Sequence, residues 1–327
     1  MEKREAEYYN ITKDKIVKCN LCPHYCIIQP GKEGICWARK NDNGTLYAQN
    51  YGNTTSLAID PIEKKPLFHF HPGTEILSVS PNGCNMRCPF CQNYTISARK
   101  TPTRYISPEQ LVELAKRYNT PSIAFTYSEP IIWFEYIMDT AKYAKPEGID
   151  LVMVTNGLIN EEPLKDLLEI INAMNIDLKS MDEEYYRKVL KGDLATTKKT
   201  IEISSEKIHI EVTNLLIPGD NDHDIENLSI YLSSIDKNIP LHISRYFPYL
   251  GYKRPPTPIE MLKHAHEIAS GYLHYVYIGN APIDGAENTY CPECPNLLVQ
   301  RTAYRTRIVG IENHHCSNCG RVVDIVL

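Results

Sequence analysis

Three cysteines with the spacing of a metal site lie in the segment Cys84-Asn-Met-Arg-Cys88-Pro-Phe-Cys91. Thiolates are soft, strong ligands for iron–sulfur clusters, zinc and copper(I). Three thiolates on a cubane cluster would leave its fourth iron with an open coordination position, and open positions are typical of catalytic metal sites. A zinc knuckle completed by a distant ligand is the alternative, because short cysteine motifs also arise by chance.

The other eight of the eleven cysteines form two groups of four. The groups are Cys19, Cys22, Cys26 and Cys36, and Cys291, Cys294, Cys316 and Cys319. Prolines and glycines in the first group supply tight turns that can fold a short loop around one centre, and the spacing fits zinc and an auxiliary iron–sulfur cluster equally well. The second group forms two CxxC knuckles around a β-rich stretch, residues 297–311, which is typical of a zinc ribbon; a rubredoxin-like iron is the alternative.

Composition predicts one large domain with small appendages, since 327 residues suffice for a barrel or doubly wound fold of ordinary size. The net charge is −5 and the basic residues are scattered, so we do not expect nucleic acid as a partner. Even Arg301, Arg305 and Arg307, which alternate between the knuckles, are expected on a solvated strand face. We expect a cytoplasmic protein without a membrane segment, because the start lacks a signal-peptide core and no apolar run is long enough for a span. The cytosol keeps thiols reduced, so the cysteines are better explained by metals than by disulfides.

The apolar pattern between residues 75 and 280 alternates between short β-rich runs and longer helical stretches, which predicts βα units and a parallel sheet. The predicted strands are 76–80, 122–126, 150–155, 174–178, 208–216, 241–245 and 275–278. The predicted helices are 108–118, 131–144, 162–171, 196–204, 225–234 and 258–270. Ser107 before Pro108, with Gln110 three residues later, predicts a capping box at the first helix. Before these units, His69 and His71 are expected to be hydrogen-bonded structural residues.

Polar or conformationally special residues follow six of these strands in succession. They are the Cys84 loop, residues 127–130, 155–157, 177–179, 213–219 and 244–246. In βα barrels the chemistry lies at the carboxyl ends of the strands. Each segment alone is usually a turn or a solvated ion pair. Their ordered recurrence after the three cysteines predicts a site at one rim.

These segments resemble the radical S-adenosylmethionine (SAM) enzymes, in the branch of the glycyl-radical-enzyme activases such as pyruvate formate-lyase activating enzyme. The chain is most similar to the AmmeMemoRadiSam system group. The resemblance lies in residues 81–93, 125–130, 177–179, 211–219, 242–248 and 285–291, and residues 19–36 resemble the leader of that group. It implies an α/β fold: a partial (β/α)6 TIM-like barrel at residues 61–282, a four-Cys metal module at 1–60 and a zinc ribbon at 283–327.

The resemblance also implies the site. Cys84, Cys88 and Cys91 hold a [4Fe–4S] cluster, and SAM binds its open iron. The implied SAM contacts are Phe90, Ser128, Glu129, Pro130, Thr155, Asn156, Asp177, Lys179 and Asn214. Among them, Phe90 lies beside the adenine, Glu129 suits the amino group, Lys179 faces the carboxylate with Asp177 as its motif partner, and Asn214 is a candidate for the ribose hydroxyls.

Two departures from the activases concern the SAM and cation sites. Val154 stands where related activases carry an Asp that helps hold a monovalent cation, so the sequence leaves open whether such a site exists. Tyr127 and Ser128 stand where the family has two glycines, which let the backbone approach closely.

The implied activity is that of a radical SAM oxidoreductase. A one-electron donor of flavodoxin or ferredoxin type reduces the cluster, SAM is cleaved, and the 5′-deoxyadenosyl radical abstracts hydrogen from an unidentified substrate. A protein or peptide substrate is expected, and a Memo-like protein is one candidate. The alternative is a zinc-binding module that contacts protein or RNA without catalysis. The open three-cysteine loop followed by the polar strand ends favours the enzyme.

Overall fold

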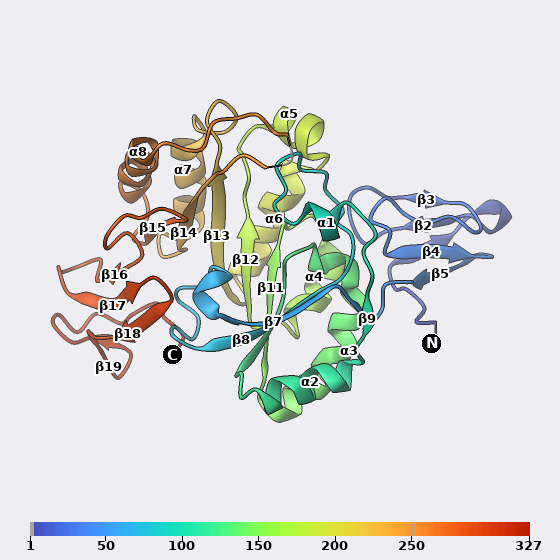
Figure 1. Ribbon diagram of the computed structural model, residues 1–327, viewed down its shortest axis with the longest axis horizontal. Coiled ribbons are helices and arrows are strands. Elements are labelled where there is room, and N and C mark those ends of the chain that lie inside the picture. Colours follow the sequence, from blue (N-terminus) through green and yellow to red (C-terminus); the bar gives the residue numbers. More distant parts are fainter. Residues whose placement is uncertain (1–2, 250) are drawn as a thin grey trace. The chain divides into compact units, whose positions relative to one another are not determined.

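The computed structural model describes residues 3–249 and 251–327 (Figure 1). The chain divides into two compact units. Unit 1 comprises Met1–Asp60, Glu75–Met174 and Glu184–Ile208, and unit 2 comprises Pro61–Thr74, Asn175–Glu183 and His209–Leu327. The predicted domain boundaries at residues 60 and 282 stay predictions. In the described part of the chain, none of the helices has both the length and the apolar character that a membrane span needs.

Unit 1 is built on parallel strands. They are β8 (Glu75–Ser80), β10 (Ser122–Phe125) and β11 (Asp150–Thr155), with β7 (Ser56–Pro61) beside β8. Leu77 pairs with Ile123, and Ala124 pairs with Val152, in parallel register. All four residues of β10 are buried, as expected for a parallel sheet that is covered on both faces. The sequence predicted these three parallel strands but not β7, which mixes polar and apolar residues.

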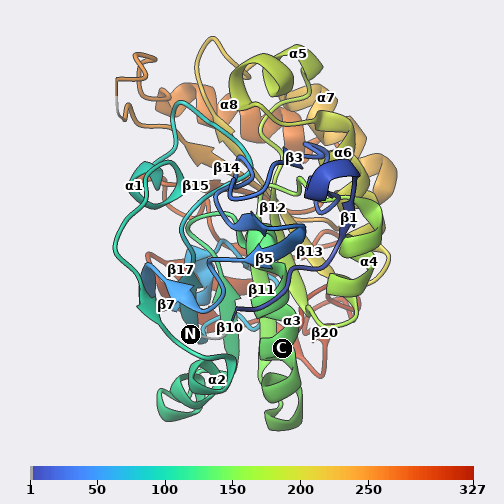
Figure 2. The same ribbon diagram turned by 90° about the vertical axis from the view of Figure 1, so that its right-hand side faces the viewer.

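Helices lie between the parallel strands of unit 1 in the sequence and after the last of them. They are α1 (Tyr94–Ser97), α2 (Pro108–Arg117), α3 (Phe134–Ala144), α4 (Glu161–Leu168), α5 (Glu183–Tyr185) and α6 (Leu194–Ser205), with a π-helical turn at Tyr186–Leu190. The predicted capping box is confirmed, because the Ser107 side chain accepts from Gln110 N and the Gln110 side chain accepts from Ser107 N. Helices α2 and α3 lie side by side in both views (Figures 1 and 2).

The N-terminal segment of unit 1 consists of short antiparallel strands (Figure 2). Strands β1 (Tyr9–Ile11), β2 (Val17–Cys19) and β3 (Ile27–Ile28) form one sheet, β4 (Arg39–Asp42) and β5 (Thr45–Ala48) form a hairpin, and β6 (Asn53–Thr54) pairs with β9 (Arg104–Tyr105). The buried Asn41 side chain donates to Ile28 O at 2.7 Å and to Lys15 O at 2.8 Å. These bonds join the hairpin to the first sheet.

Unit 2 repeats the βα pattern. Strands β13 (His209–Leu216), β14 (Leu241–Arg245) and β15 (Val276–Gly279) are parallel neighbours, and helices α7 (Ile225–Ile235) and α8 (Ile259–Ser270) connect them. Strand β12 (Ala173–Asp177) crosses the boundary between the units in the sequence. Every predicted strand and helix between residues 75 and 280 is confirmed. The largest errors are of three residues: α4 stops at Leu168 where residue 171 was predicted, and α3 begins at Phe134 where residue 131 was predicted, because a 3-10 helix occupies Pro130–Trp133. The closure of the strands into a partial barrel remains a prediction.

A buried polar network holds the loop before β8 to the strands of unit 2. The Glu211 carboxylate accepts from Phe68 N at 2.8 Å and His69 N at 2.7 Å, and lies 2.5 Å from His242 Nε2. Although burial opposes ionisation, the side chains of His242 and of His209, whose Nε2 lies 3.1 Å from Glu211 Oε1, keep the pKa of Glu211 well below its ordinary value. His69 is fully buried and contacts Tyr277 Oη and Asp324 O, so its expected structural role is confirmed.

The C-terminal part of unit 2 contains β16 (Thr289–Tyr290), β17 (Leu297–Thr302), β18 (Arg305–Ile308), β19 (Ile311–Glu312) and β20 (His315–Cys316). The expectation that three arginines share one solvated face is wrong for Arg301, which is 4% exposed. Its guanidinium donates to Phe68 O at 2.6 Å and Glu287 O at 2.9 Å, and lies over the Phe68 ring. Arg305 and Arg307 are exposed as expected. Strand alternation does not reveal which face is covered by a loop from another part of the chain.

Candidate metal centre and active site

The three-cysteine loop of unit 1 begins where β8 ends. Gly83, which precedes Cys84, has φ +105°, a conformation that side chains rarely allow. The three cysteines are half-buried, and polar groups face two of their sulfurs: Met86 N lies 3.3 Å from Cys84 Sγ, and Ser97 Oγ lies 3.2 Å from Cys91 Sγ. The loop therefore presents thiols together with hydrogen-bond donors that stabilise thiolates.

The chemistry of this donor set fits an iron–sulfur cluster. Burial raises the pKa of Cys84 well above its ordinary value, and the negative charge of Glu129 adds to this. A thiolate at this position therefore needs a positive partner, which a metal centre supplies. Cluster sulfurs also accept hydrogen bonds that tune the reduction potential. Cys84, Cys88 and Cys91 are thus suited to hold a cluster.

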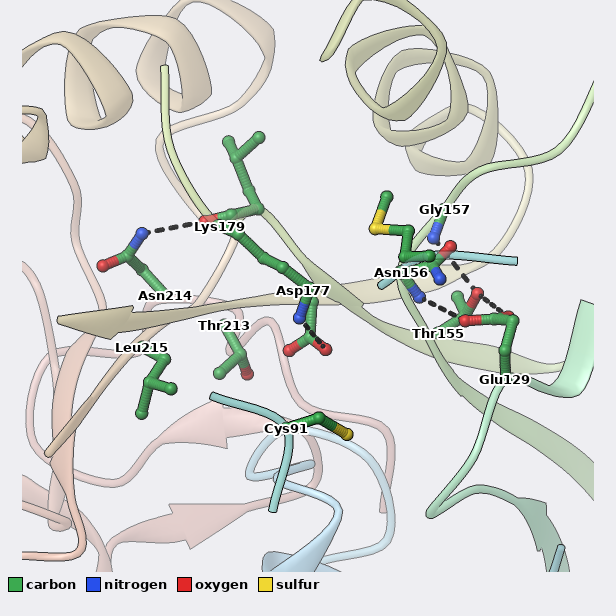
Figure 3. A network of polar contacts seen from close by, with 12 residues as sticks. Cys91, Glu129, Thr155, Asn156, Gly157, Asp177, Lys179, Thr213, Asn214 and Leu215 are labelled. Carbon is green, nitrogen blue, oxygen red and sulfur yellow. Dashed lines mark hydrogen bonds and ion pairs between the residues drawn. The ribbon is translucent and has the colours of Figure 1, made fainter. Parts of the chain in front are cut away.

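Glu129 joins the ends of β10 and β11 in unit 1 (Figure 3). Its side chain is almost fully buried and accepts three hydrogen bonds: from Thr155 Oγ1 at 2.7 Å, Asn156 N at 2.9 Å and Ile131 N at 3.0 Å. Pro130 begins the short 3-10 helix that Glu129 caps. Because a carboxylate has about four acceptor positions, these donors fix the group firmly. The polar residues that follow β10 and those that follow β11 therefore lie together in unit 1, as the sequence predicted.

Tyr127 and Ser128, which the resemblance places where the activases have glycines, are each accommodated in the structure. Tyr127 has φ +65°, the left-handed conformation that glycine adopts without strain, and its hydroxyl bonds to Asp60. Ser128 Oγ donates to Pro81 O at 2.8 Å and accepts from Ser80 Oγ at 3.0 Å. The Ser128 hydroxyl therefore binds the chain just before the cysteine loop.

Asn156 connects β11 to the cysteine loop. Its Nδ2 donates to Asn85 Oδ1 at 2.9 Å and lies 3.7 Å from Cys84 Sγ, while its Oδ1 accepts from Leu158 N at 2.9 Å. Asn85 in turn donates to Leu158 O at 2.8 Å. This closed set of bonds positions the loop beside the strand end. Phe90, in the same loop, is 4% exposed.

Three further predicted SAM contacts, Asp177, Lys179 and Asn214, belong to unit 2. Lys179 Nζ donates to Asp177 Oδ2 at 2.9 Å (Figure 3). Asn214 is fully buried, and its Nδ2 donates to Leu178 O at 2.8 Å. Within the described residues, Asn214 Oδ1 has no hydrogen-bond partner. A buried acceptor of this kind suits a hydroxyl donor, but the side chain lies beneath the protein surface. Its assignment to the ribose stays a prediction.

The C-terminal quartet of unit 2 is a compact metal site. The ligand atoms of Cys291, Cys294, Cys316 and Cys319 all lie within 4.8 Å of one another. Two of the sulfur pairs, Cys291–Cys319 and Cys294–Cys316, are 3.6 Å apart. A single tetrahedral metal with metal–sulfur bonds of about 2.3 Å holds its sulfurs about 3.8 Å apart. The quartet therefore fits one metal ion.

The N-terminal quartet of unit 1 lines one small cavity. Cys19, Cys22, Cys26 and Cys36 surround it together with apolar side chains, Arg39 and Asn85. Burial raises the pKa of Cys36 to about 11. Arg39 is almost fully buried, its Nη1 lies 4.0 Å from Cys19 Sγ, and it forms an ion pair with the buried Glu135. Although burial opposes its charge, Glu135 raises the pKa of Arg39.

Several residues that sequence reasoning did not select support these sites. Asn85 and Arg87 lie between the cysteines of the three-cysteine motif, and this position in the sequence could have identified them as residues of the site. Arg87 Nη1 donates to Cys84 O at 2.6 Å. Arg39 and Glu135 are 96 positions apart, and no local pattern connects them. All eleven cysteines are free of disulfides.

Comparisons with known proteins show what this chain is similar to. The Radical SAM superfamily model matches residues 78–231. The chain is 45% identical to the uncharacterized protein MJ0808 of Methanocaldococcus jannaschii, over 99% of this chain and 100% of that protein. It is 26% identical to pyruvate formate-lyase 1-activating enzyme of Escherichia coli K12, over 43% of this chain and 61% of that enzyme. The structure of TYW1 with a lysine-pyruvate adduct has a TM-score of 0.50 and 18% identity, over 70% of this chain and 89% of TYW1, a likeness of fold alone.

Proposed function

Because the chain belongs to the radical SAM superfamily and to the same family as the M. jannaschii protein, we propose that it cleaves SAM reductively and abstracts hydrogen from a substrate. The observation that carries this proposal is the loop of unit 1. The three cysteines there are half-buried, hydrogen-bond donors face Cys84 and Cys91, and the loop is bonded through Asn156 to the strand end that holds Glu129. A zinc knuckle needs a fourth protein ligand, whereas this loop leaves one position open for SAM.

When bound, the [4Fe–4S] cluster and SAM supply the one-electron chemistry that yields methionine and a 5′-deoxyadenosyl radical. The protein supplies the ligands Cys84, Cys88 and Cys91. Glu129 presents a fixed negative charge, which suits the ammonium of SAM. Thr155, Asn156 N and Ile131 N hold that carboxylate in one orientation, so little reorganisation is needed when SAM binds.

Other SAM contacts in this proposal rest on the resemblance of the sequence. Phe90 contacts the adenine, Ser128 and Pro130 belong to the segment at the amino group, Lys179 with Asp177 faces the carboxylate, and Asn214 serves the ribose. Ser128 acts through the backbone at this site, because its hydroxyl is already bonded to Pro81 O. No Asp is present for a monovalent cation at Val154.

We propose a protein or peptide as the substrate, within the AmmeMemoRadiSam system. The support is the similarity to pyruvate formate-lyase 1-activating enzyme, which by its name activates another enzyme. A Memo-like protein is the first candidate substrate, and a flavodoxin or ferredoxin is the electron donor. An oxidoreductase of this kind suits the cytoplasm, where thiols stay reduced. For the C-terminal quartet we propose zinc in a ribbon, since its sulfur spacing fits one tetrahedral ion.

Electron paramagnetic resonance (EPR) of the reconstituted, dithionite-reduced protein tests the cofactor site. We expect a [4Fe–4S]+ signal that changes on addition of SAM, because SAM binds the open iron. The double variant C88S/C91S should lose the SAM-responsive signal. Glu129→Gln should keep the signal but require about ten times more SAM for the same change, since one charge-assisted contact is worth about 1.5 kcal/mol.

A different result would contradict the proposal. Zinc at the Cys84 loop in protein purified without oxygen, together with an EPR spectrum that ignores SAM, would favour the binding module without catalysis. Such a protein would be colourless and carry about three zinc ions per chain, one for each cysteine group.

A further inference from the structure

We propose that Cys19, Cys22, Cys26 and Cys36 hold a second iron–sulfur cluster, and that this cluster passes electrons to the cluster of the Cys84 loop. The inference rests in part on the proposed function, because the relay needs an acceptor at that loop. The metal content of the N-terminal site can be established separately. The second cluster and the relay are supported by the spacing of the sulfurs, by the lining of their cavity and by contacts within unit 1 between this quartet and the Cys84 loop.

The spacing of the sulfurs favours a polynuclear centre. Among the described residues, the C-terminal quartet is the group whose ligand atoms all lie within 4.8 Å of one another, as a single metal requires. The N-terminal sulfurs do not form so tight a group, although all four line the same cavity. In a [4Fe–4S] cluster each thiolate binds a different iron, so the sulfurs stand further apart around a larger core. The two quartets of this chain therefore suit different metal centres.

The wall of the cavity suits an anionic centre that is shielded from water. Leu21, Ile28 and Ile132 are buried and supply apolar surface. Arg39 also lines the cavity, is 1% exposed, and among the described residues its Nε has no hydrogen-bond partner. An unpaired buried donor costs free energy unless an acceptor is present. Thiolate and sulfide of a cluster are acceptors that would satisfy it.

The N-terminal segment docks directly on the Cys84 loop. His24, between Cys22 and Cys26, lies 2.6 Å from Asn85 O through its Nε2. Arg87 donates to Ile35 O, and its guanidinium lies over the Trp37 ring at 5.2 Å. These contacts join the chain on either side of Cys36 to the middle of the three-cysteine motif.

Further contacts bring the backbones of the two motifs together. A Cβ built on Gly83 would lie 2.3 Å from Cys36 O, so the residue before Cys84 touches the fourth cysteine of the quartet. Asn160, at the start of α4, donates from N to Leu21 O at 3.0 Å and from Nδ2 to Asn20 O at 2.7 Å. The segment between Cys19 and Cys22 is therefore anchored as well.

Asn85 connects the two centres most directly. It lines the N-terminal cavity, and it is adjacent in sequence to Cys84. Its side chain is bonded to Asn156, whose Nδ2 lies 3.7 Å from Cys84 Sγ. A cluster in the cavity would thus be separated from the loop cluster by little more than one residue.

The relay transfers one electron at each step. A reduced low-potential flavin or iron–sulfur protein loses one electron to the N-terminal cluster, which changes from [4Fe–4S]2+ to [4Fe–4S]+. That cluster returns to [4Fe–4S]2+ as it reduces the loop cluster by one electron. No proton or bond is exchanged. The N-terminal cluster supplies no catalysis of its own in this scheme.

Metal analysis of the full-length protein, reconstituted without oxygen, tests the site. We expect about eight irons and one zinc per chain, corresponding to two cubane clusters and the C-terminal site. The double variant C22S/C26S should retain about four irons and the SAM-responsive EPR signal. The matched variant C88S/C91S should also retain about four irons, with a signal that does not respond to SAM.

EPR of the fully reduced wild type tests the proximity. Two paramagnetic clusters as close as the contacts require will interact magnetically, so the wild-type spectrum should differ from the sum of the spectra of the two double variants. A spectrum equal to that sum would overturn the relay.

Other outcomes separate this inference from the proposed function. About four irons and two zinc ions in the wild type, with loss of zinc rather than iron in C22S/C26S, would overturn the second cluster and leave the SAM chemistry intact. The proposed function would be contradicted instead if C88S/C91S kept all of its iron, C22S/C26S lost all of its iron, and the EPR signal of the wild type did not respond to SAM. The wild-type iron content decides the inference even if a variant does not fold.

Discussion

Gly83 faces the carbonyl oxygen of Cys36 so closely that a methyl group on its Cα would lie 2.3 Å from that oxygen. The contact joins two cysteine motifs that are separated by more than forty residues in the sequence. It also explains the residue type, because Gly83 has φ +105° and no space for a side chain. The N-terminal quartet is therefore fitted against the cysteine loop by backbone contact.

Replacement of Gly83 by Ala should disrupt this contact. The methyl group would meet backbone rather than a flexible side chain, so we expect a loss of about 2 to 4 kcal/mol in the free energy of unfolding. Gly148→Ala is the matched control, because Gly148 also has a positive φ, +65°, but has open space around its Cα. It should lose only about 1 kcal/mol. Urea unfolding of both variants measures the difference; equal losses would show that the packing against Cys36 does not matter.

Asn156 should tune the cluster held by the loop. Its Nδ2 lies 3.7 Å from Cys84 Sγ, and a donor near a cluster sulfur stabilises the more negative, reduced state. Asn156→Ala should therefore make the reduction potential more negative by about 20 to 60 mV, the equivalent of one hydrogen bond for one electron. An EPR-monitored redox titration measures the shift. Asn172→Ala is the control, since Asn172 bonds to Leu151 N at the other end of β11. Equal potentials in the two variants would contradict the role of Asn156.

Arg301 should stabilise unit 2, whereas Arg305 should not. Arg301 is buried and donates to two backbone carbonyls and to Thr289 Oγ1, while Arg305 is exposed. Arg301→Met leaves these acceptors unpaired and should lower the free energy of unfolding by about 3 kcal/mol. Arg305→Met should change it by less than about 0.5 kcal/mol. Thermal or urea unfolding of the two variants measures this difference. An equal loss in the free energy of unfolding from both would mean that the hydrogen bonds of Arg301 do not stabilise unit 2.

Acid should weaken unit 2 through His69. Burial lowers the pKa of His69 from 6.5 to about 3, against the attraction of Glu211. Between these values the unfolded chain binds a proton that the folded chain does not, so stability is full above about pH 6.5 and falls as the pH decreases. One such group changes the free energy of unfolding by at most about 1.4 kcal/mol per pH unit.

His69→Gln tests this dependence, because a glutamine can donate to Asp324 O and accept from Tyr277 without titrating. Urea unfolding between pH 6.5 and 5 should give a shallower slope in the variant than in the wild type. Burial also lowers the pKa of His266, which therefore adds to the slope in both proteins and cancels in the comparison. The pKa of Glu211 is well below 4.5, so that group acts at lower pH. Identical slopes would show that His69 is not held neutral.

The sequence was sufficient to predict the parts of the fold that depend on local pattern. Apolar runs placed the strands, and the logic of strand ends brought Glu129 and Asn156 to neighbouring positions, where the structure joins them at 2.9 Å. The capping box at Ser107 was readable because it involves four consecutive residues. Local pattern did not distinguish β7, because its apolar run is only three residues long and is flanked by Ser56, Asp60 and Pro61, as in a loop.

The remaining features depend on contacts between distant segments. Arg301 looked like a solvent-facing residue until the loop around Phe68 was found to cover it. The ion pair of Arg39 with Glu135 and the contact of Gly83 with Cys36 likewise have no local signature. The N-terminal spacing alone fitted zinc and iron–sulfur equally well, and it is the three-dimensional arrangement of the sulfurs that favours the cluster.

The formation of 5′-deoxyadenosine tests the central claim most directly. The reconstituted protein is incubated without oxygen with SAM and dithionite, and 5′-deoxyadenosine and methionine are quantified. We predict equal amounts of the two products from the wild type and none from Cys88→Ser, whose loop lacks one ligand. Equal product from Cys88→Ser and wild type, or zinc in place of iron at the loop of the wild type, would contradict the assignment of this chain as a SAM-cleaving enzyme.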